Sequence, residues 1–148
     1  MVFRPGSYVI NGAGGLSVTG NANISGNDVS FYFTGPATIN VTGTPTLNLR
    51  APASGQYAGM LMWQALTDTA NPSLSAATGS LNGILYFPSD KLSFAANTTL
   101  NIGVVVAASV SAGGGANLTI RGAAINGGAG VPGGLPRAFT DPSAVLVE

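Results

Sequence analysis

The chain has 148 residues, of which 45% are hydrophobic and only 7% are charged, with five positive and five negative side chains. This length fits a single domain over residues 1–148 with a sizeable apolar core, and the low, balanced charge argues against nucleic acid as a partner. Cysteine and histidine are absent, which removes the commonest nucleophiles, bases and metal ligands, so we expect no enzymatic activity, no cofactor and no bound metal.

Residues 3–49 repeat a short phrase, in which a few alternating apolar residues are followed by Asn or Gly and then by Thr or Ser and Gly. Alternation with a period of two predicts short strands with one buried face. The expected strand centres are Val9, Val18, Ile24, Phe31, Ile39 and Leu47. Three such segments make a coil of about 20 to 25 residues. We therefore predict an all-β, single-domain parallel β-helix or β-solenoid of short strands with Gly and Asn turns.

The pattern loosens between residues 50 and 80, which predicts one long, irregular loop insertion. Residues 59–63 read as a strand that is apolar on both faces, so both faces must be covered. We expect the polar loop over residues 66–80 to fold back across this strand, with Tyr57 and Trp63 as anchors. The same two side chains are the candidate contacts for a partner or a glycan.

Strand patterns return after residue 80 and continue to residue 126. The expected strands cover residues 81–88, 91–94, 99–102, 104–106, 109–111 and 117–120. Residues 127–134 are predicted to be a Gly-rich loop, and their glycine spacing opens no helix, so they do not predict a dinucleotide site. The tail over residues 144–148 is predicted to be a last strand or a docking arm.

Several phrases follow one another in a defined order. They are Pro5-Gly-Ser-Tyr-Val-Ile-Asn-Gly12, Gly14-Gly-Leu-Ser-Val-Thr-Gly-Asn-Ala-Asn-Ile-Ser-Gly26, Val29-Ser-Phe-Tyr-Phe-Thr-Gly35, Leu49-Arg-Ala-Pro52, Tyr57-Ala-Gly-Met-Leu61 and Leu81-Asn-Gly-Ile-Leu-Tyr-Phe-Pro88. Together they resemble the C-terminal β-rich region of TadE/TadG-like Flp pilus-assembly proteins, over residues 5–148. The resemblance implies an exported, envelope-associated protein that ends in a strand. The N-terminal membrane helix of that family is missing here, so membrane anchoring is not carried over.

Neither a signal peptide nor a membrane span is predicted. The longest apolar stretch, residues 103–110, is about half of the roughly 20 residues that a spanning helix needs. Residues 1–15 lack a basic start, an apolar core and a cleavage site. With the resemblance, we expect an extracellular or cell-surface bacterial location, as a processed product or an excised domain.

Asp28, Asp68 and Asp90 are the candidates for a carboxylate site, because β-helical glycosidases and lyases use carboxylates from adjacent coils. All three lie in turn sequences, where Asp bonds its own backbone, so a structural role is favoured. The same oxygens suit calcium, but calcium-binding repeats carry an acid in every turn, whereas the corner residue here is Asn or Gly. The basic residues at positions 50, 91, 121 and 137 are scattered in the sequence and are expected to be single solvated charges.

Neither end of the predicted coil carries an obvious cap, which leaves unpaired backbone groups at both ends. The expected stacking ends are Val9 and Val18 at the first coil, and Leu118 and Val145 at the last. A head-to-tail contact between such ends does not close and gives a filament. We expect a non-enzymatic, extracytoplasmic structural module of a pilus-like or filamentous surface assembly, with other copies of itself or with envelope and pilus proteins as partners. The alternatives are a carbohydrate- or partner-binding adhesin module and a β-helical polysaccharide-degrading enzyme.

Overall fold

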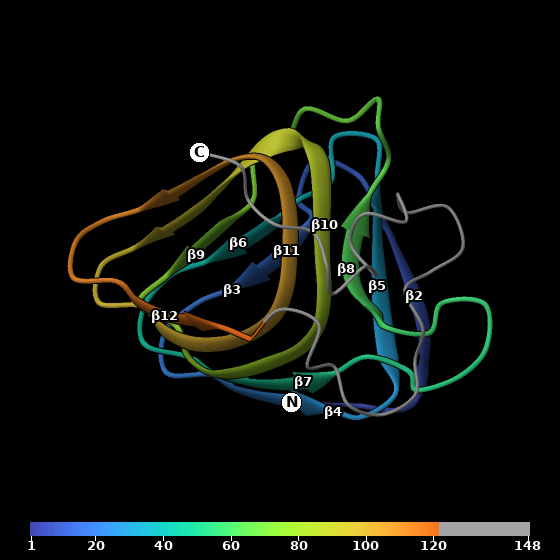
Figure 1. Cartoon of the computed structure of the whole chain (residues 1–148), viewed down its shortest axis with the longest axis horizontal. Coiled ribbons are helices and arrows are strands. Elements are labelled where there is room, and N and C mark those ends of the chain that lie inside the picture. Colours follow the sequence, from blue (N-terminus) through green and yellow to red (C-terminus); the bar gives the residue numbers. More distant parts are fainter. Residues whose placement is uncertain (122–148) are drawn as a thin grey trace, which may run out of the picture.

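The described part of the chain consists of parallel strands that wind into a stack of coils. The computed structural model describes residues 1–121, in which twelve strands join into one continuous sheet and no helix occurs. Every strand pair is parallel. The all-β, solenoid-like arrangement predicted from the sequence is therefore confirmed (Figure 1). The predicted Gly-rich loop and the predicted C-terminal tail lie outside the described residues.

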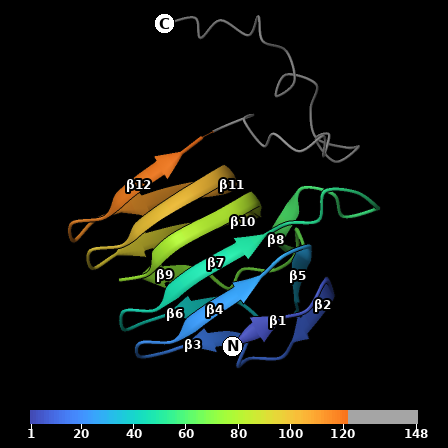
Figure 2. The same cartoon turned by 90° about the horizontal axis from the view of Figure 1, so that it is seen from below.

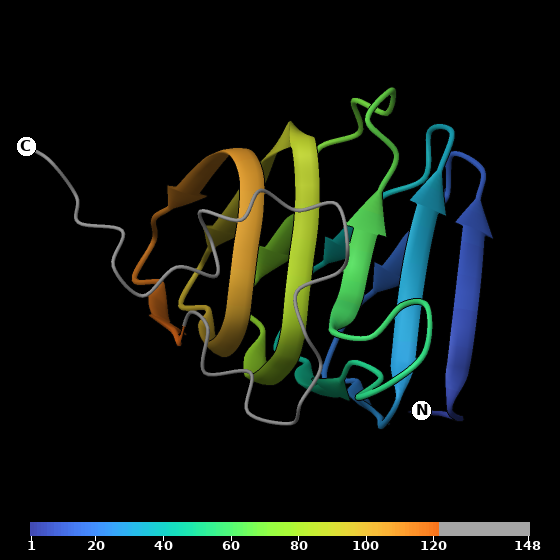
Figure 3. The ribbon, with the colours of Figure 1, turned by 45° about the vertical axis from the view of Figure 1, so that its right-hand side comes forward.

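Each coil contributes one segment to each of three faces. The first face contains β1 (Val2–Phe3), β4 (Asn23–Gly26), β7 (Thr46–Arg50) and β12 (Asn117–Ile120), and Figure 2 shows them in one row, with parts of β10 and β11 between β7 and β12. The second face contains β2 (Gly6–Asn11), β5 (Val29–Thr34) and β8 (Met60–Gln64), which Figure 3 shows in a row. The third face contains β3 (Leu16–Val18), β6 (Ile39–Val41) and β9 (Ser73–Ser75). Two long strands, β10 (Thr78–Ala95) and β11 (Thr99–Ala112), bend around the coil and pair along all three faces.

The strand register gives the length of each coil. Val2 lies beside Ser25 and Asn23 lies beside Thr46, so the first two coils each take 23 residues. The next step, from Thr46 to Thr78, takes 32 residues, and the two steps after it take 21 and 18. The third coil is longer because it contains two loops, residues 51–59 and residues 65–72, which flank β8.

Inward-facing side chains of successive coils stack into columns that form the core. Along the second face one column contains Tyr8, Phe31, Met62, Leu85 and Val105. The three middle members of this column are fully buried, whereas the members in the first and last of these coils are only partly buried. Burial therefore depends on having a coil on both sides, as expected for a stack in which each unit contacts only its neighbours.

Two features differ from the sequence-based expectation. The short strands expected between residues 81 and 111 are instead joined into the two long strands β10 and β11. At one corner Gly83 and Gly103 stack, which lets both chains bend close to each other. The polar loop expected over residues 66–80 ends at residue 72, before β9 begins. The ring that lies against Trp63 comes from Tyr57, in the loop before β8 and not in the loop after it. Among residues 1–121 no helix is long and apolar enough to cross a membrane.

Candidate functional site

The first coil leaves one edge of its three strands without a partner in the described part of the chain. The strands β1, β2 and β3 pair only with β4, β5 and β6. The N–H of Gly6 donates to the carbonyl of Asp28 (2.9 Å), and the N–H of Leu16 donates to the carbonyl of Thr38 (2.8 Å). Because successive residues of a strand direct their backbone groups to opposite edges, the N–H groups of Val9 and Ser17 face the unpaired edge.

This unpaired edge is also apolar. Met1, Val2 and Val9 are 73%, 76% and 68% exposed, and the inward-facing Ile10 and Leu16 are only partly buried. In the middle coils the corresponding inward positions are buried. The open end of the stack therefore combines free backbone donors with apolar side chains.

The residues predicted as stacking ends have different placements. Val9 lies on β2 and is exposed, whereas the side chain of Val18 on β3 is buried in the core of the same coil. Leu118 lies on β12, the last described strand, and is partly buried against the core. Val145 lies outside the described residues.

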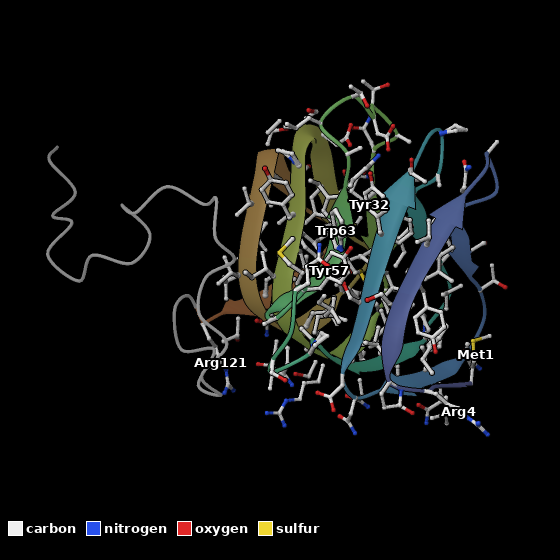
Figure 4. All side chains as sticks on the ribbon, turned by 90° about the vertical axis from the view of Figure 1, so that its right-hand side faces the viewer. Met1, Arg4, Tyr32, Tyr57, Trp63 and Arg121 are labelled. Carbon is white, nitrogen blue, oxygen red and sulfur yellow. The ribbon has the colours of Figure 1, made fainter. Side chains whose placement is uncertain are left out.

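The predicted contact residues Tyr57 and Trp63 meet on the outside of the second face. The rings of Trp63 and Tyr32 stack with centroids 4.0 Å apart, and the ring of Tyr57 lies 5.4 Å from that of Trp63. The indole N–H of Trp63 donates to Ser30 Oγ (3.1 Å). Figure 4 shows Trp63 between the two tyrosines. These contacts hold the loop over residues 51–59 on β8, and binding of a partner or a glycan by Tyr57 and Trp63 stays a prediction.

A second group of side chains gathers where the second face turns into the third. The loop over residues 65–72 and the bend of β10 over residues 88–91 form this region, which we call the acidic corner. It contains Asp68 and Asp90, which are only 7% and 3% exposed. Two carboxyl groups are thus covered at one corner, where repulsion between them is unfavourable unless a proton or a cation intervenes.

Two hydrogen bonds hold the loop against the bend. The hydroxyl of Ser89 donates to the carbonyl of Leu66 (2.6 Å), and the N–H of Lys91 donates to Asn71 Oδ1 (2.9 Å). Asp90 lies between these two anchoring residues in the sequence. The bend therefore closes over the loop at both of its ends, with Asp90 between the anchors.

Gln64, the last residue of β8, joins the same corner. The register Phe33 to Gln64 places its side chain on the inward side of the second face, where it is 1% exposed. Its Nε2 donates to the carbonyl of Ala70 (3.5 Å), inside the loop. The register of β10 with β9 pairs Ser93 with Ser73, so the bend over residues 88–91 and the loop over residues 65–72 lead into neighbouring strands of the third face.

The acidic corner concentrates the buried polar atoms that lack partners. In residues 1–121 the buried side-chain atoms without a hydrogen-bond partner are Thr38 Oγ1, Gln64 Oε1, Asp68 Oδ2 and Asp90 Oδ2. Three lie in the acidic corner, and the fourth lies one coil below it, in the turn before β6. Burial raises the pKa of the Asp90 carboxyl above its ordinary value, and repulsion by Asp68 raises that pKa further.

The structure brings together two of the three predicted aspartates and separates the third. Asp28 is exposed and lies at a different corner, between the first and second faces, with a positive φ of 55°. Gln64 was not predicted as a site residue. The available signal was its position, because it is a polar residue at the end of an otherwise apolar strand. No group of three or more His, Cys, Asp or Glu within residues 1–121 is placed to hold a metal ion.

Two of the four basic residues that are scattered in the sequence lie in one column of the first face together with Arg4, and Arg137 lies outside the described residues. Arg50 lies beside Asn82 at the end of the first face, and the register of that face places Arg4 and Arg121 in the same column, one residue after β1 and β12. All three arginines are exposed, and Figure 4 shows Arg4 and Arg121 along the same edge of the molecule. Since adjacent coils are about 4.8 Å apart, Arg4 and Arg50 lie about 10 Å apart along this edge.

Comparisons with known proteins identify no relative of this chain. No protein-family model matches it, and neither does any curated protein or any solved structure. The resemblance to TadE/TadG-like pilus-assembly proteins therefore stays a prediction.

Proposed function

We propose that this chain is a parallel β-helix that serves as a non-enzymatic building block of an extracellular or cell-surface filament, such as a pilus-like assembly of the TadE/TadG type. In this proposal the first coil of one copy docks on the last coil of the next. The partner is a second copy of the same chain, and the backbone ladder continues from copy to copy.

The observation that carries the proposal is the unpaired edge of the first coil. Its strands direct free N–H and C=O groups away from the stack, and its exposed side chains include Met1, Val2 and Val9. An exposed apolar strand edge is a template for pairing with another chain. Proteins that remain monomeric cover such edges with charged residues, proline or a capping segment, whereas Val9 is uncharged and lies at the middle of β2.

The other end of the described stack offers a matching edge. The strand β12 continues the column that begins with β1, and it pairs only with β11 among the described strands. Val110 and Ile120, near this end, are each 49% exposed. Since the two edges repeat the same strand geometry, one coil can continue the register of the other. The docking coil contains Leu118 or, beyond the described residues, the predicted strand at Val145.

A contact between two different ends of the same molecule does not close, so it propagates into a filament. The low charge of the chain gives weak repulsion between copies. In this arrangement Arg121 of one copy lies near Arg4 of the next. Both arginines are exposed, so salt screens the repulsion between them. We therefore expect assembly to strengthen as the ionic strength rises.

The first prediction concerns Val9. Val9→Pro removes the N–H that faces the unpaired edge while leaving the pairing of β2 with β5 intact, since proline is tolerated on that side of an edge strand. We expect Val9→Pro to remain monomeric at concentrations at which the unchanged protein forms filaments, by sedimentation velocity and negative-stain electron microscopy.

Val9→Thr is the matched control, because it keeps the N–H and the branched shape, and it should assemble. The thermal unfolding of both variants, measured below the assembly concentration, checks that the fold is intact. Filaments formed equally well by folded Val9→Pro, or an unchanged protein that stays monomeric at every concentration and ionic strength, would contradict the proposal.

A further inference from the structure

The acidic corner has a property that the proposed filament does not use. Asp68 and Asp90 are more than nine-tenths buried, come from segments about twenty residues apart, and each keeps one carboxylate oxygen without a partner. Leaving a buried carboxylate oxygen unpaired costs free energy, and placing two carboxyl groups close together costs more. A group that occupies this corner and carries positive charge would remove both costs.

A third oxygen comes from a side chain with no charge. Gln64 is 1% exposed, and its amide nitrogen is held by the Ala70 carbonyl within the loop over residues 65–72. This long hydrogen bond (3.5 Å) directs the amide nitrogen toward the loop, and Oε1 is a buried acceptor without a partner. The hydrogen bonds of Ser89 and Lys91 tie the bend that carries Asp90 to this same loop, so all three unpartnered oxygens belong to the acidic corner.

We propose that the acidic corner is a calcium-binding site, with Asp68, Asp90 and Gln64 Oε1 as ligands. Carboxylate and amide oxygens are the donors that hard cations prefer, and calcium accepts the irregular geometry that a loop supplies, whereas magnesium requires a near-ideal octahedron. The chain has no cysteine and no histidine, so it lacks the thiolate and imidazole ligands that favour zinc or copper.

The anchors of the loop support this arrangement. The hydrogen bonds from Ser89 to Leu66 and from Lys91 to Asn71 tie the bend over residues 88–91 to both ends of the loop. They hold the loop that carries Asp68 against the bend that carries Asp90, and the charge of Asp68 acts unfavourably on the Asp90 carboxylate. A bound cation replaces that repulsion with two attractions, so binding should tighten the loop on β10.

The test is isothermal titration calorimetry of the unchanged protein with calcium chloride, together with thermal unfolding in calcium and in EDTA. We expect one calcium ion per chain and a higher unfolding temperature in calcium. Asp68→Asn and Asp90→Asn should each weaken calcium binding by at least about tenfold, the lower end of what is lost when a supporting group of a metal site is removed. Asp28→Asn is the matched control, and it should bind calcium as the unchanged protein does.

Three results would overturn the proposal. The first is no calcium binding by the unchanged protein, whatever the variants do. The second is binding that Asp28→Asn weakens as much as Asp90→Asn, which indicates weak attraction to surface charge. The third is an unfolding temperature that calcium leaves unchanged while Asp68→Asn and Asp90→Asn raise it, which indicates an acid pair that shares a proton. Filament formation is not needed for any of these measurements, so this site and the proposed function can fail separately.

Discussion

The carboxyl of Asp90 is buried beside a second carboxyl, and this placement disturbs its ionisation. Burial is the main cause of its raised pKa, and the charge of Asp68, from the loop that packs against it, is the second. The folded protein therefore holds a proton on Asp90 more tightly than the unfolded chain does. Between the ordinary pKa and the raised pKa the folded state carries more protons, so its stability falls as the pH rises through this window.

We predict that Asp90→Asn raises the unfolding temperature at neutral pH in EDTA and flattens the fall of this temperature as the pH rises above the ordinary pKa of an aspartate. The amide carries no charge, so the substitution removes both the cost of burying a carboxylate and the repulsion by Asp68. The measurement is thermal unfolding by circular dichroism across this pH range, with the exposed Asp28→Asn as the control. An Asp90→Asn protein that unfolds at a lower temperature than the unchanged protein at neutral pH, in EDTA, contradicts this account.

At the scale of elements, the long strands β10 and β11 depend on a close approach of two backbones. A Cβ atom on Gly103 would lie 2.5 Å from the carbonyl oxygen of Gly83, where no real Cβ contact occurs. The φ angle of Gly103 is outside the left-handed region, so space and not backbone conformation requires glycine there. This corner is one reason why both strands turn from the first face to the second without an intervening loop.

Gly103→Ala should therefore lower the free energy of unfolding by about 1–3 kcal/mol, the usual cost of forcing an extra methyl group into a packed position. Gly14→Ala is the matched control, because a Cβ atom at Gly14 has nothing within 4 Å. Urea denaturation followed by tryptophan fluorescence gives both values. Equal midpoints for the two variants would show that the stack accommodates the methyl group at Gly103.

At the scale of the whole molecule, each coil contacts only the coils next to it, so stability is a sum over neighbouring interfaces. The middle coils have two such interfaces, and their inward side chains, including Phe31 and Phe33, are fully buried. The first coil has one interface in the described structure, and its Tyr8 and Ile10 are only partly buried. We therefore expect the first coil to open more readily than the middle of the stack.

Amide hydrogen exchange followed by mass spectrometry measures this difference. In the monomer we expect the fastest exchange among the strands in β1, β2 and β3, and slower exchange in β5, β7 and β8, because local opening exposes fewer contacts at the end than in the middle. If assembly occurs through the first coil, exchange in β2 should slow on filament formation. Uniform exchange across all these strands in the monomer would mean that the stack opens as a single cooperative unit.

The period-two pattern by itself determined where the strands of the first two coils lie. Phe31 and Phe33 face inward and Tyr32 faces outward, because alternation is a local property of an extended chain and the apolar side must be buried. The spacing of the strand centres also predicted the length of the regular coils. Tertiary structure alone decided which distant residues meet. Asp68 lies near Asp90, and Arg50 aligns with Arg121, only because of how many residues the loops of the third coil and the later coils contain. The register depends on the loops, whose length no periodic pattern reveals.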